Sequence, residues 1–144
     1  MADMTLPDLA KKLADIDFAM LFTRAEAGEL AGRPMSNNGE VEYEGTSYYF
    51  TWDGSRMVAD IEREPRVGLS FQGSKGLLPK PPIMVAVEGV AELVRDPAAF
   101  EEHWDKSMNR WFKDGPATPG VTMIKVVAKR IHYWDGEDEG EVKV

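Results

Sequence analysis

The segment of residues 83–94 places the strongest limit on the fold of this chain. Apolar residues occupy every second position in it, with one interruption at Gly89. This spacing is typical of a strand that buries one face, and a glycine inside such a strand indicates a bulge or bend. The residues that share the predicted buried face are Ile83, Val85, Val87, Ala91 and Leu93. The sequence therefore predicts a long strand with one buried side.

Five further segments have the composition of strands. They are rich in β-branched, aromatic or aliphatic residues, which favour extended structure. They are residues 18–23, 30–37, 47–52, 66–72 and 121–134. Pro34 has no backbone N–H, so the segment that contains it is expected at an edge of the sheet or beside something other than a strand. Asn37-Asn38-Gly39 is a strong turn signal after this segment.

Three helices are predicted around these strands, and each has a capping residue at its start. The caps are Thr5 for residues 5–17, Ser55 for the helix that carries Met57, Val58 and Ile61, and Asp96 for residues 98–111. The last helix has an apolar stripe made of Phe100, Trp104, Met108 and Trp111. Such a stripe is usually part of a core, although it can also wall a flat ligand or a dimer interface.

This order of elements predicts a mainly β fold with flanking helices. About six strands with hairpin-like connections favour an antiparallel, Greek-key-like sheet that closes into a small barrel with helices on its outside. The 144 residues have the size of one domain, and residues 1–144 show no internal repeat or domain boundary. Five acidic residues lie among the last ten, 135–144, and predict a solvated, mobile end.

Composition narrows the range of partners and chemistry. The net charge of −8 argues against nucleic acid and anionic membranes as partners. The absence of cysteine excludes disulfides, thiolate chemistry and cysteine-based metal sites. The N-terminal residues show no basic segment followed by an apolar one, and no apolar run has the length of a membrane span. A cytoplasmic protein is therefore expected.

Catalytic triads and metal sites have little support in the sequence. The two histidines, His103 and His132, do not stand in motifs typical of a nucleophile's base or a metal ligand. A packing or surface role is expected for both. No metal site is predicted, and no catalytic acid or base is identified.

The start of the second predicted helix has the features of a phosphate site. Thr51, Ser55 and Arg56 bring two hydroxyl groups and a guanidinium to a helix N-terminus, where free N–H groups attract anions. Arg33 from a neighbouring strand and Lys75 could add further cations. The alternative is that Ser55 only caps the helix and that Arg56 is solvated. Because an aromatic strand precedes this helix, the pattern suggests a flat aromatic ligand with a phosphate tail, such as flavin mononucleotide (FMN).

An ordered set of short motifs, spanning about residues 5–135, resembles a known family. The motifs are Met20-Leu21-Phe22-Thr23, Gly28-Glu29-Leu30, Arg33-Pro34-Met35, Phe50-Thr51 with Ser55-Arg56, Pro65-Arg66-Val67, Val87-Glu88-Gly89-Val90-Ala91, Trp104 to Trp111-Phe112, and Tyr133-Trp134. They are similar to those of the bacterial general stress protein 26-like proteins, which are related to pyridoxamine 5′-phosphate oxidase. The resemblance implies an FMN-binding split β-barrel that forms a homodimer, with FMN held between the subunits.

The resemblance also implies which residues bind the cofactor. They are Arg33, Pro34, Met35, Phe50, Thr51, Ser55, Arg56 and Trp111. The first five would line the isoalloxazine ring and the ribityl chain. Ser55 and Arg56 would contact the phosphate, with Arg56 standing where many relatives have lysine. Trp111 would approach the flavin from the partner subunit.

Two functions fit this resemblance. The first is an FMN-dependent oxidoreductase of the general stress class, with a reduced nicotinamide as a candidate electron donor. The second is a flavin-binding carrier or stress sensor without turnover. Some relatives bind FAD or a deazaflavin in place of FMN, so these cofactors are alternatives. The residues that hold pyridoxal phosphate in true oxidases are not recognisable here, so vitamin B6 oxidation is not expected.

Overall fold

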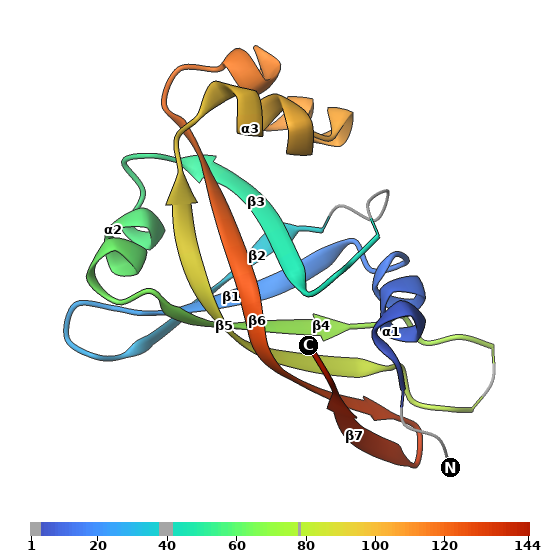
Figure 1. The fold of residues 1–144 in the computed structure, drawn as a ribbon. Coiled ribbons are helices and arrows are strands. Elements are labelled where there is room, and N and C mark those ends of the chain that lie inside the picture. Colours follow the sequence, from blue (N-terminus) through green and yellow to red (C-terminus); the bar gives the residue numbers. More distant parts are fainter. Residues whose placement is uncertain (1–3, 38–41, 78) are drawn as a thin grey trace.

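The computed structural model describes residues 4–37, 42–77 and 79–144 (Figure 1). Within these ranges the helices are α1 (Leu6–Leu13), α2 (Arg56–Arg63) and α3 (Pro97–His103), with two short 3-10 helices, η1 (Lys106–Arg110) and η2 (Gly115–Ala117). The strands are β1 (Phe18–Arg24), β2 (Leu30–Ser36), β3 (Thr46–Trp52), β4 (Arg66–Gln72), β5 (Met84–Val94), β6 (Val121–Asp135) and β7 (Asp138–Val142). The turn predicted at Asn38-Gly39 lies outside the described residues.

The strands form one antiparallel sheet in the order β2-β1-β4-β5-β6-β3, and β7 also pairs with β6. The two longest strands, β5 and β6, pair from Met84 opposite Trp134 to Val94 opposite Met123. Both strands bend along their length, so the sheet curls on itself (Figure 1). The prediction of an antiparallel barrel is confirmed, with seven described strands in place of about six. Pro34 lies on the edge strand β2, as predicted.

The bulge predicted at Gly89 is present in β5. The register against β6 shifts there, since Glu88 lies opposite Arg130 and Gly89 lies opposite Ala128. A Cβ atom on Gly89 would lie 2.9 Å from the carbonyl oxygen of Val127. Because backbone atoms cannot give way as a side chain can, this position requires glycine.

The C-terminal segment corrects the expectation of a mobile end. After a turn at Gly136, whose φ is 66°, β7 returns along β6. Val142 is buried in the main core, whereas Glu139 and Glu141 are exposed on the strand. Arg130 donates a hydrogen bond to Glu141. The acidic composition made this segment resemble a solvated end, although from Glu139 on its residues alternate between exposed and less exposed positions and the buried Val142 packs it against the barrel.

The first helix is shorter than the predicted 5–17. Its capping box is present as predicted, because Thr5 accepts a hydrogen bond from the N–H of Asp8, and the carboxylate of Asp8 accepts one from the N–H of Thr5. α1 ends at Leu13, where the side-chain amide of Asn37 donates to the carbonyl oxygens of Leu13 and Ile16 at 2.9 and 2.8 Å. These bonds satisfy carbonyl groups that a longer helix would have used itself.

The third helix is also shorter than the predicted 98–111. α3 ends at His103, and Trp104 has an extended backbone. The carboxylate of Asp105 then accepts hydrogen bonds from the N–H and the hydroxyl of Ser107 and starts η1. Such local bonds favour a new helix start over continuation. The predicted stripe is therefore divided, and Trp111 at its end is 54% exposed.

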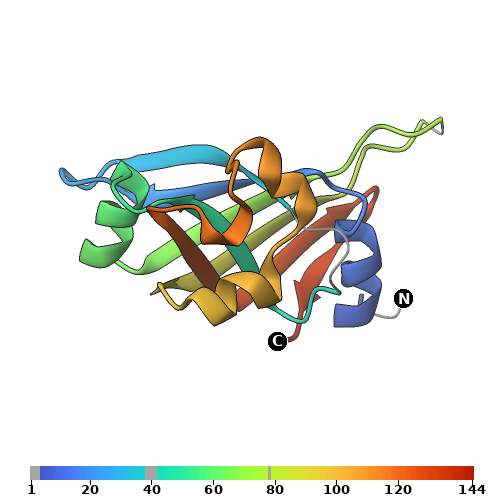
Figure 2. The ribbon, with the colours of Figure 1, turned by 90° about the horizontal axis from the view of Figure 1, so that it is seen from above.

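Two groups of buried side chains stabilise the molecule. The main core fills the barrel and is closed by α1 and α2 at opposite ends (Figures 1 and 2). The second group lies between β3 and the segment from α3 to η2, and it also includes Val121 and Met123 of β6. We call four of its buried side chains and the partly buried Trp104 the β3 aromatic cluster: Phe50, Phe100, Trp104, Met108 and Phe112. No helix among the described residues is long and apolar enough to cross a membrane.

Candidate functional site

The N-terminus of α2 is built as the sequence predicts. Ser55 has an extended backbone, and its Oγ accepts a hydrogen bond from the N–H of Val58 at 3.3 Å. Ser55 is therefore the N-cap, with its hydroxyl already engaged by the helix. Arg56, the first residue of α2, is exposed.

Arg33 points from the middle of β2 toward the space beside α2. Its Nη1 donates to Thr23 Oγ1 at 2.7 Å and to the carbonyl oxygen of Ala31 at 3.1 Å. Its Nη2 lies 3.7 Å from Asp60 Oδ2. The side chain is 22% exposed, so it reaches solvent only over part of its surface.

Asp60 is the centre of this arrangement, and the sequence analysis did not identify it. Its side chain is 3% exposed, accepts a hydrogen bond from Thr23 Oγ1 at 2.8 Å, and pairs with Arg63 at 3.0 Å. We call Thr23, Arg33, Asp60 and Arg63 the α2 ion cluster. A sequence signal existed, because Asp60 follows Met57 by three positions and precedes Ile61 on the apolar face of α2. A carboxylate on such a face is buried and needs partners.

Arg33 and Arg56 lie near one another at this end of the barrel. Burial lowers the pKa of Arg33 most, Asp60 raises it, and the positive charge of Arg56 lowers it again. The Arg33 guanidinium remains charged at neutral pH. Two cations from different elements that repel each other form a natural place for an anion. Lys75 does not belong to this group, because it lies in the loop between β4 and β5, at the opposite end of the molecule from α2 (Figures 1 and 2).

The other predicted residues of β2 lie on two faces. Met35 is buried in the main core, on the same face of the strand as Arg33. Pro34 is exposed on the opposite face, where it lies across from Met20 of β1. The three consecutive residues therefore do not present their side chains to one surface, although the backbone of all three follows the free edge of the sheet.

Phe50 and Thr51 lie on β3, at the other edge of the sheet. Phe50 is buried in the β3 aromatic cluster, with its ring centroid 4.6 Å from that of Trp104 and 5.9 Å from that of Phe100. Thr51 is half-buried and pairs with Thr122 of β6. Trp111 follows η1 and is exposed, with Arg110 6.0 Å above its ring.

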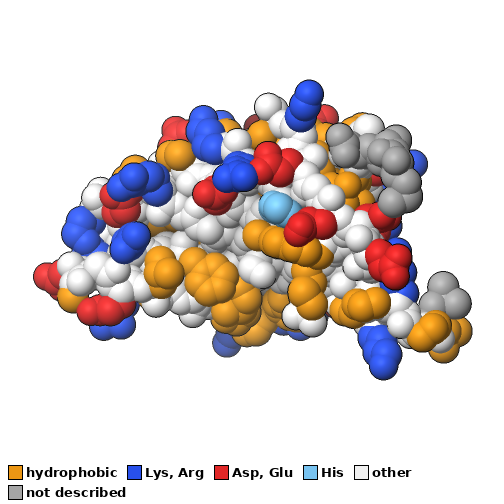
Figure 3. Space-filling view, turned by 90° about the horizontal axis from the view of Figure 1, so that it is seen from below, with side chains coloured by type: hydrophobic (Ala, Val, Ile, Leu, Met, Phe, Trp, Pro, Cys, Tyr) orange, Lys and Arg blue, Asp and Glu red, His pale blue; other side chains and the backbone are white. Residues whose placement is uncertain are grey.

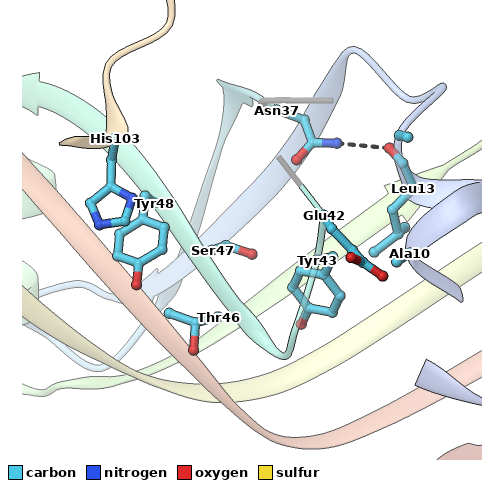
Figure 4. Close-up of a pocket in the computed structure, with 10 residues that line it drawn as sticks. Ala10, Leu13, Asn37, Glu42, Tyr43, Thr46, Ser47, Tyr48 and His103 are labelled. Carbon is cyan, nitrogen blue, oxygen red and sulfur yellow. Dashed lines mark hydrogen bonds between the residues drawn. The ribbon is translucent and has the colours of Figure 1, made fainter. Parts of the chain in front are cut away.

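The curl of the sheet brings the end of β2 beside the middle of β3. A hollow of about 10 Å³ between them has walls from both strands and from η1, including Ser36, Tyr49, Phe50 and Met108. It shares Asn37, Tyr48 and His103 with a second cavity of about 40 Å³ that extends toward α1 (Figure 4). These cavities begin where the predicted residues of β2 and β3 end, so they extend the predicted site away from α2.

The second cavity is lined by aromatic and hydroxyl groups. The rings of His103 and Tyr48 stack with centroids 3.6 Å apart (Figure 4). Burial raises the pKa of Tyr43, which lines this cavity, to about 12. Burial also raises the pKa of Tyr49, which lines the smaller hollow and whose hydroxyl has no hydrogen-bond partner among the described residues. Both tyrosines are therefore neutral at physiological pH and do not supply a base.

The described part of the chain contains no group of three or more His, Cys, Asp or Glu side chains that could hold a metal ion. What the arrangement can do is bind an anion beside α2 and present a partly aromatic seam next to it.

Comparisons with known structures agree with the barrel architecture. A protein from Clostridium acetobutylicum related to general stress protein 26 is 18% identical and has a TM-score of 0.79, with 96% of this chain and 94% of that chain covered. General stress protein 26 from Bacillus anthracis is 22% identical and has a TM-score of 0.71, with 94% and 98% covered. A heme binding protein from Mycobacterium smegmatis is 15% identical, with a TM-score of 0.74, and this chain covers 60% of it.

These identities show the fold, which is a split β-barrel as predicted. No curated protein sequence matches the chain at a significant level. The family model described as pyridoxamine 5′-phosphate oxidase like matches residues 5–144, nearly the whole chain. The protein therefore belongs to the pyridoxamine 5′-phosphate oxidase-like family.

Proposed function

We propose that this protein binds FMN, with the phosphate beside Arg33 and Arg56 and the ring along the seam between β2 and β3. The observation that carries the proposal is that Arg33, held by Thr23 and Asp60 on the β1 and α2 side, lies close enough to Arg56 at the capped start of α2 for the two positive charges to act on one another. Arginine pairs well with phosphate, and a helix N-terminus adds favourable N–H dipoles. The family and the relatives named for general stress protein 26 support the same reading.

The order of the predicted residues supports one orientation of the ligand. Five successive antiparallel pairings separate β2 from β3, so these two strands run in opposite directions. From α2 outward, Arg33 precedes Met35 on β2, and Thr51 precedes Phe50 on β3. On both strands, the residues farther from α2 lie closer to the hollow between Ser36 and Phe50. An elongated ligand with its phosphate at α2 would therefore direct its aromatic end toward this hollow.

A second copy of the chain is part of the proposal. The outer face of the sheet carries exposed apolar side chains, including Phe18, Met20, Met84 and Trp134, and a band of hydrophobic side chains is visible on the underside of the molecule (Figure 3). Exposed apolar surface of this kind is typical of a protein interface. A homodimer through this face would cover it, and Trp111 of one subunit would then approach the flavin of the other.

Flavin chemistry would be supplied by the bound cofactor, and the chain's own residues would bind and orient it. We infer a flavin-dependent oxidoreductase of the general stress class, with a reduced nicotinamide as donor. A carrier or sensor without turnover is the second candidate. FAD and a deazaflavin are the alternative cofactors.

The test is an absorption spectrum of the purified protein after reconstitution with FMN and desalting. About one flavin retained per chain is expected. The double variant Arg33→Ala/Arg56→Ala should bind FMN about a hundredfold more weakly, because it loses two charged hydrogen-bonding partners of the phosphate. Lys75→Ala/Lys143→Ala removes the same charge outside the site and should retain the flavin. Equal FMN affinity in both double variants would show that the site is wrongly placed.

A further inference from the structure

We propose that Asp60 is a positioning residue that holds Arg33 for a phosphate monoester, an inference that rests on the proposed function. Asp60 would not touch the ligand, since its carboxylate is engaged on both oxygens: Oδ2 accepts from Thr23 and faces Arg33, and Oδ1 pairs with Arg63. Its effect on binding would pass through Arg33.

The contacts of Arg33 show how its guanidinium plane is held. Of the five N–H donors of arginine, two belong to Nη1, and these go to Thr23 Oγ1 and the carbonyl oxygen of Ala31. Thr23 in turn donates its hydroxyl to Asp60 at 2.8 Å. Thr23 is thereby fixed as an acceptor toward Arg33. Among the described residues, Nε and Nη2 of Arg33 make no hydrogen bond, although Nη2 lies 3.7 Å from Asp60 Oδ2. Nε and the side of Nη2 that faces away from Asp60 therefore remain for a ligand.

The charges beside α2 suit a doubly charged ligand group. Of the four side chains Arg33, Arg56, Arg63 and Asp60, three are positive and one is negative, so this group has a net charge of +2. Asp53 and Glu62, which lie just before and within α2, pair with Arg95. A phosphate monoester carries a charge close to −2 at neutral pH, because its second pKa is about 6. A phosphodiester, as in the pyrophosphate of FAD, has one charge per phosphorus. The α2 ion cluster together with Arg56 therefore favours a terminal phosphate, as in FMN.

Two roles of Asp60 predict opposite effects of removing its charge. If only net charge mattered, Asp60→Asn would make the site more positive and would tighten the binding of a phosphate. If Asp60 positions Arg33, the same substitution weakens that binding, because Thr23 and Arg33 lose the group that orients them. The sign of the change in affinity therefore separates the two roles.

The experiment compares FMN with riboflavin, which lacks the phosphate. Both are titrated into the flavin-free full chain and into its variants, followed by quenching of flavin fluorescence. We expect the unchanged protein to prefer FMN, and Asp60→Asn to reduce FMN affinity about tenfold with riboflavin affinity unchanged, as for the loss of one well-oriented charged hydrogen bond. Glu62→Gln is the matched control, because it makes the same charge change two residues away, where Glu62 pairs with Arg95 at the surface. It should leave both affinities unchanged.

Thr23→Val tests the same inference without altering any charge and nearly without altering shape. It removes the hydroxyl that links Asp60 to Arg33 and should reduce FMN affinity about threefold, again sparing riboflavin. A merely structural role would weaken both flavins together and leave their ratio constant, which overturns the inference. Tighter or unchanged FMN binding by Asp60→Asn overturns it as well. Equal affinity of the unchanged protein for FMN and riboflavin would instead overturn the phosphate site itself.

Discussion

The α2 ion cluster and the β3 aromatic cluster stabilise two parts of one barrel by different means. In the α2 ion cluster, Asp60 meets Thr23 and Arg63 atom to atom, at 2.8 and 3.0 Å. In the β3 aromatic cluster, rings pack edge to face with centroids between 4.6 and 5.9 Å apart. The first arrangement depends on the identity of each partner, because a buried charge without its partner is costly. The second depends mainly on filled volume, because dispersion is not directional.

This difference separates two tasks around the proposed flavin site. The α2 ion cluster fixes charged groups where an anion would bind, and it ties α2 to β1 and β2. The β3 aromatic cluster covers one face of β3 and fixes the edge strand on which Phe50 and Thr51 lie. Substitutions in the first cluster should change ligand selectivity as well as stability, whereas substitutions in the second should change stability alone.

The largest expected effect is on the aromatic side. Phe112 is 3% exposed and its ring lies 5.6 Å from that of Trp104. Phe112→Ala should lower the free energy of unfolding by about 4 kcal/mol, because it removes buried apolar surface and leaves a cavity. Phe112→Leu, which keeps most of the volume, should cost only about 1 kcal/mol. Urea denaturation measures both values. If Phe112→Ala and Phe112→Leu lowered the free energy of unfolding by similar amounts, the cluster would depend on the aromatic ring itself. It would then not differ from the α2 ion cluster in its dependence on partner identity.

A conservative change in the α2 ion cluster should cost more than the conservative change at Phe112. Asp60→Glu keeps the charge but adds one methylene group to a side chain that is 3% exposed. The carboxylate can no longer meet Thr23 and Arg63 at the same distances, and we expect a loss of about 2 kcal/mol. Urea denaturation beside Phe112→Leu gives the comparison directly. A loss below about 0.5 kcal/mol, the range of ordinary surface changes, would show that the cluster tolerates a shifted carboxylate.

Local signals explain how much of the fold could be predicted. The alternation in β5, the caps at Thr5, Ser55 and Asp96, and the edge position of Pro34 each depend on a few neighbouring residues. The predictions of the third helix and of the C-terminal end failed because two local sequence signals in each segment favoured different structures. Asp105 ended the stripe of the third helix by binding Ser107, and the alternation in β7 was hidden by its acidic composition.

The candidate site was only partly predictable for a different reason. Ser55 and Arg56 lie at a helix start, which sequence can indicate, but Asp60 and its partner Thr23 are 37 residues apart in the chain. Their contact depends on how α2 packs against β1, which no local pattern reports. The opposite faces of Pro34 and Met35 follow from the strand period, whereas the hollow between Ser36 and Phe50 exists only because the sheet curls.

The smallest expected effect concerns acid. Glu64 caps the C-terminus of α2. Its carboxylate accepts hydrogen bonds from the side chain and from the backbone N–H of Arg66, and these bonds lower the pKa of Glu64 from the ordinary value of 4.5 to about 2. A carboxylate with a lowered pKa stabilises the folded state above its unfolded pKa, and this contribution is lost as the pH falls toward about 2. The difference in unfolding free energy between the unchanged protein and Glu64→Gln should therefore be constant above about pH 5 and should shrink below about pH 4. Phe112→Leu, in the uncharged aromatic cluster, should lower stability by the same amount throughout this range. Urea denaturation across the pH series measures the effects of both substitutions on the free energy of unfolding. An effect of Glu64→Gln that did not change with pH would show that the Glu64–Arg66 pair at the end of α2 does not make stability sensitive to acid.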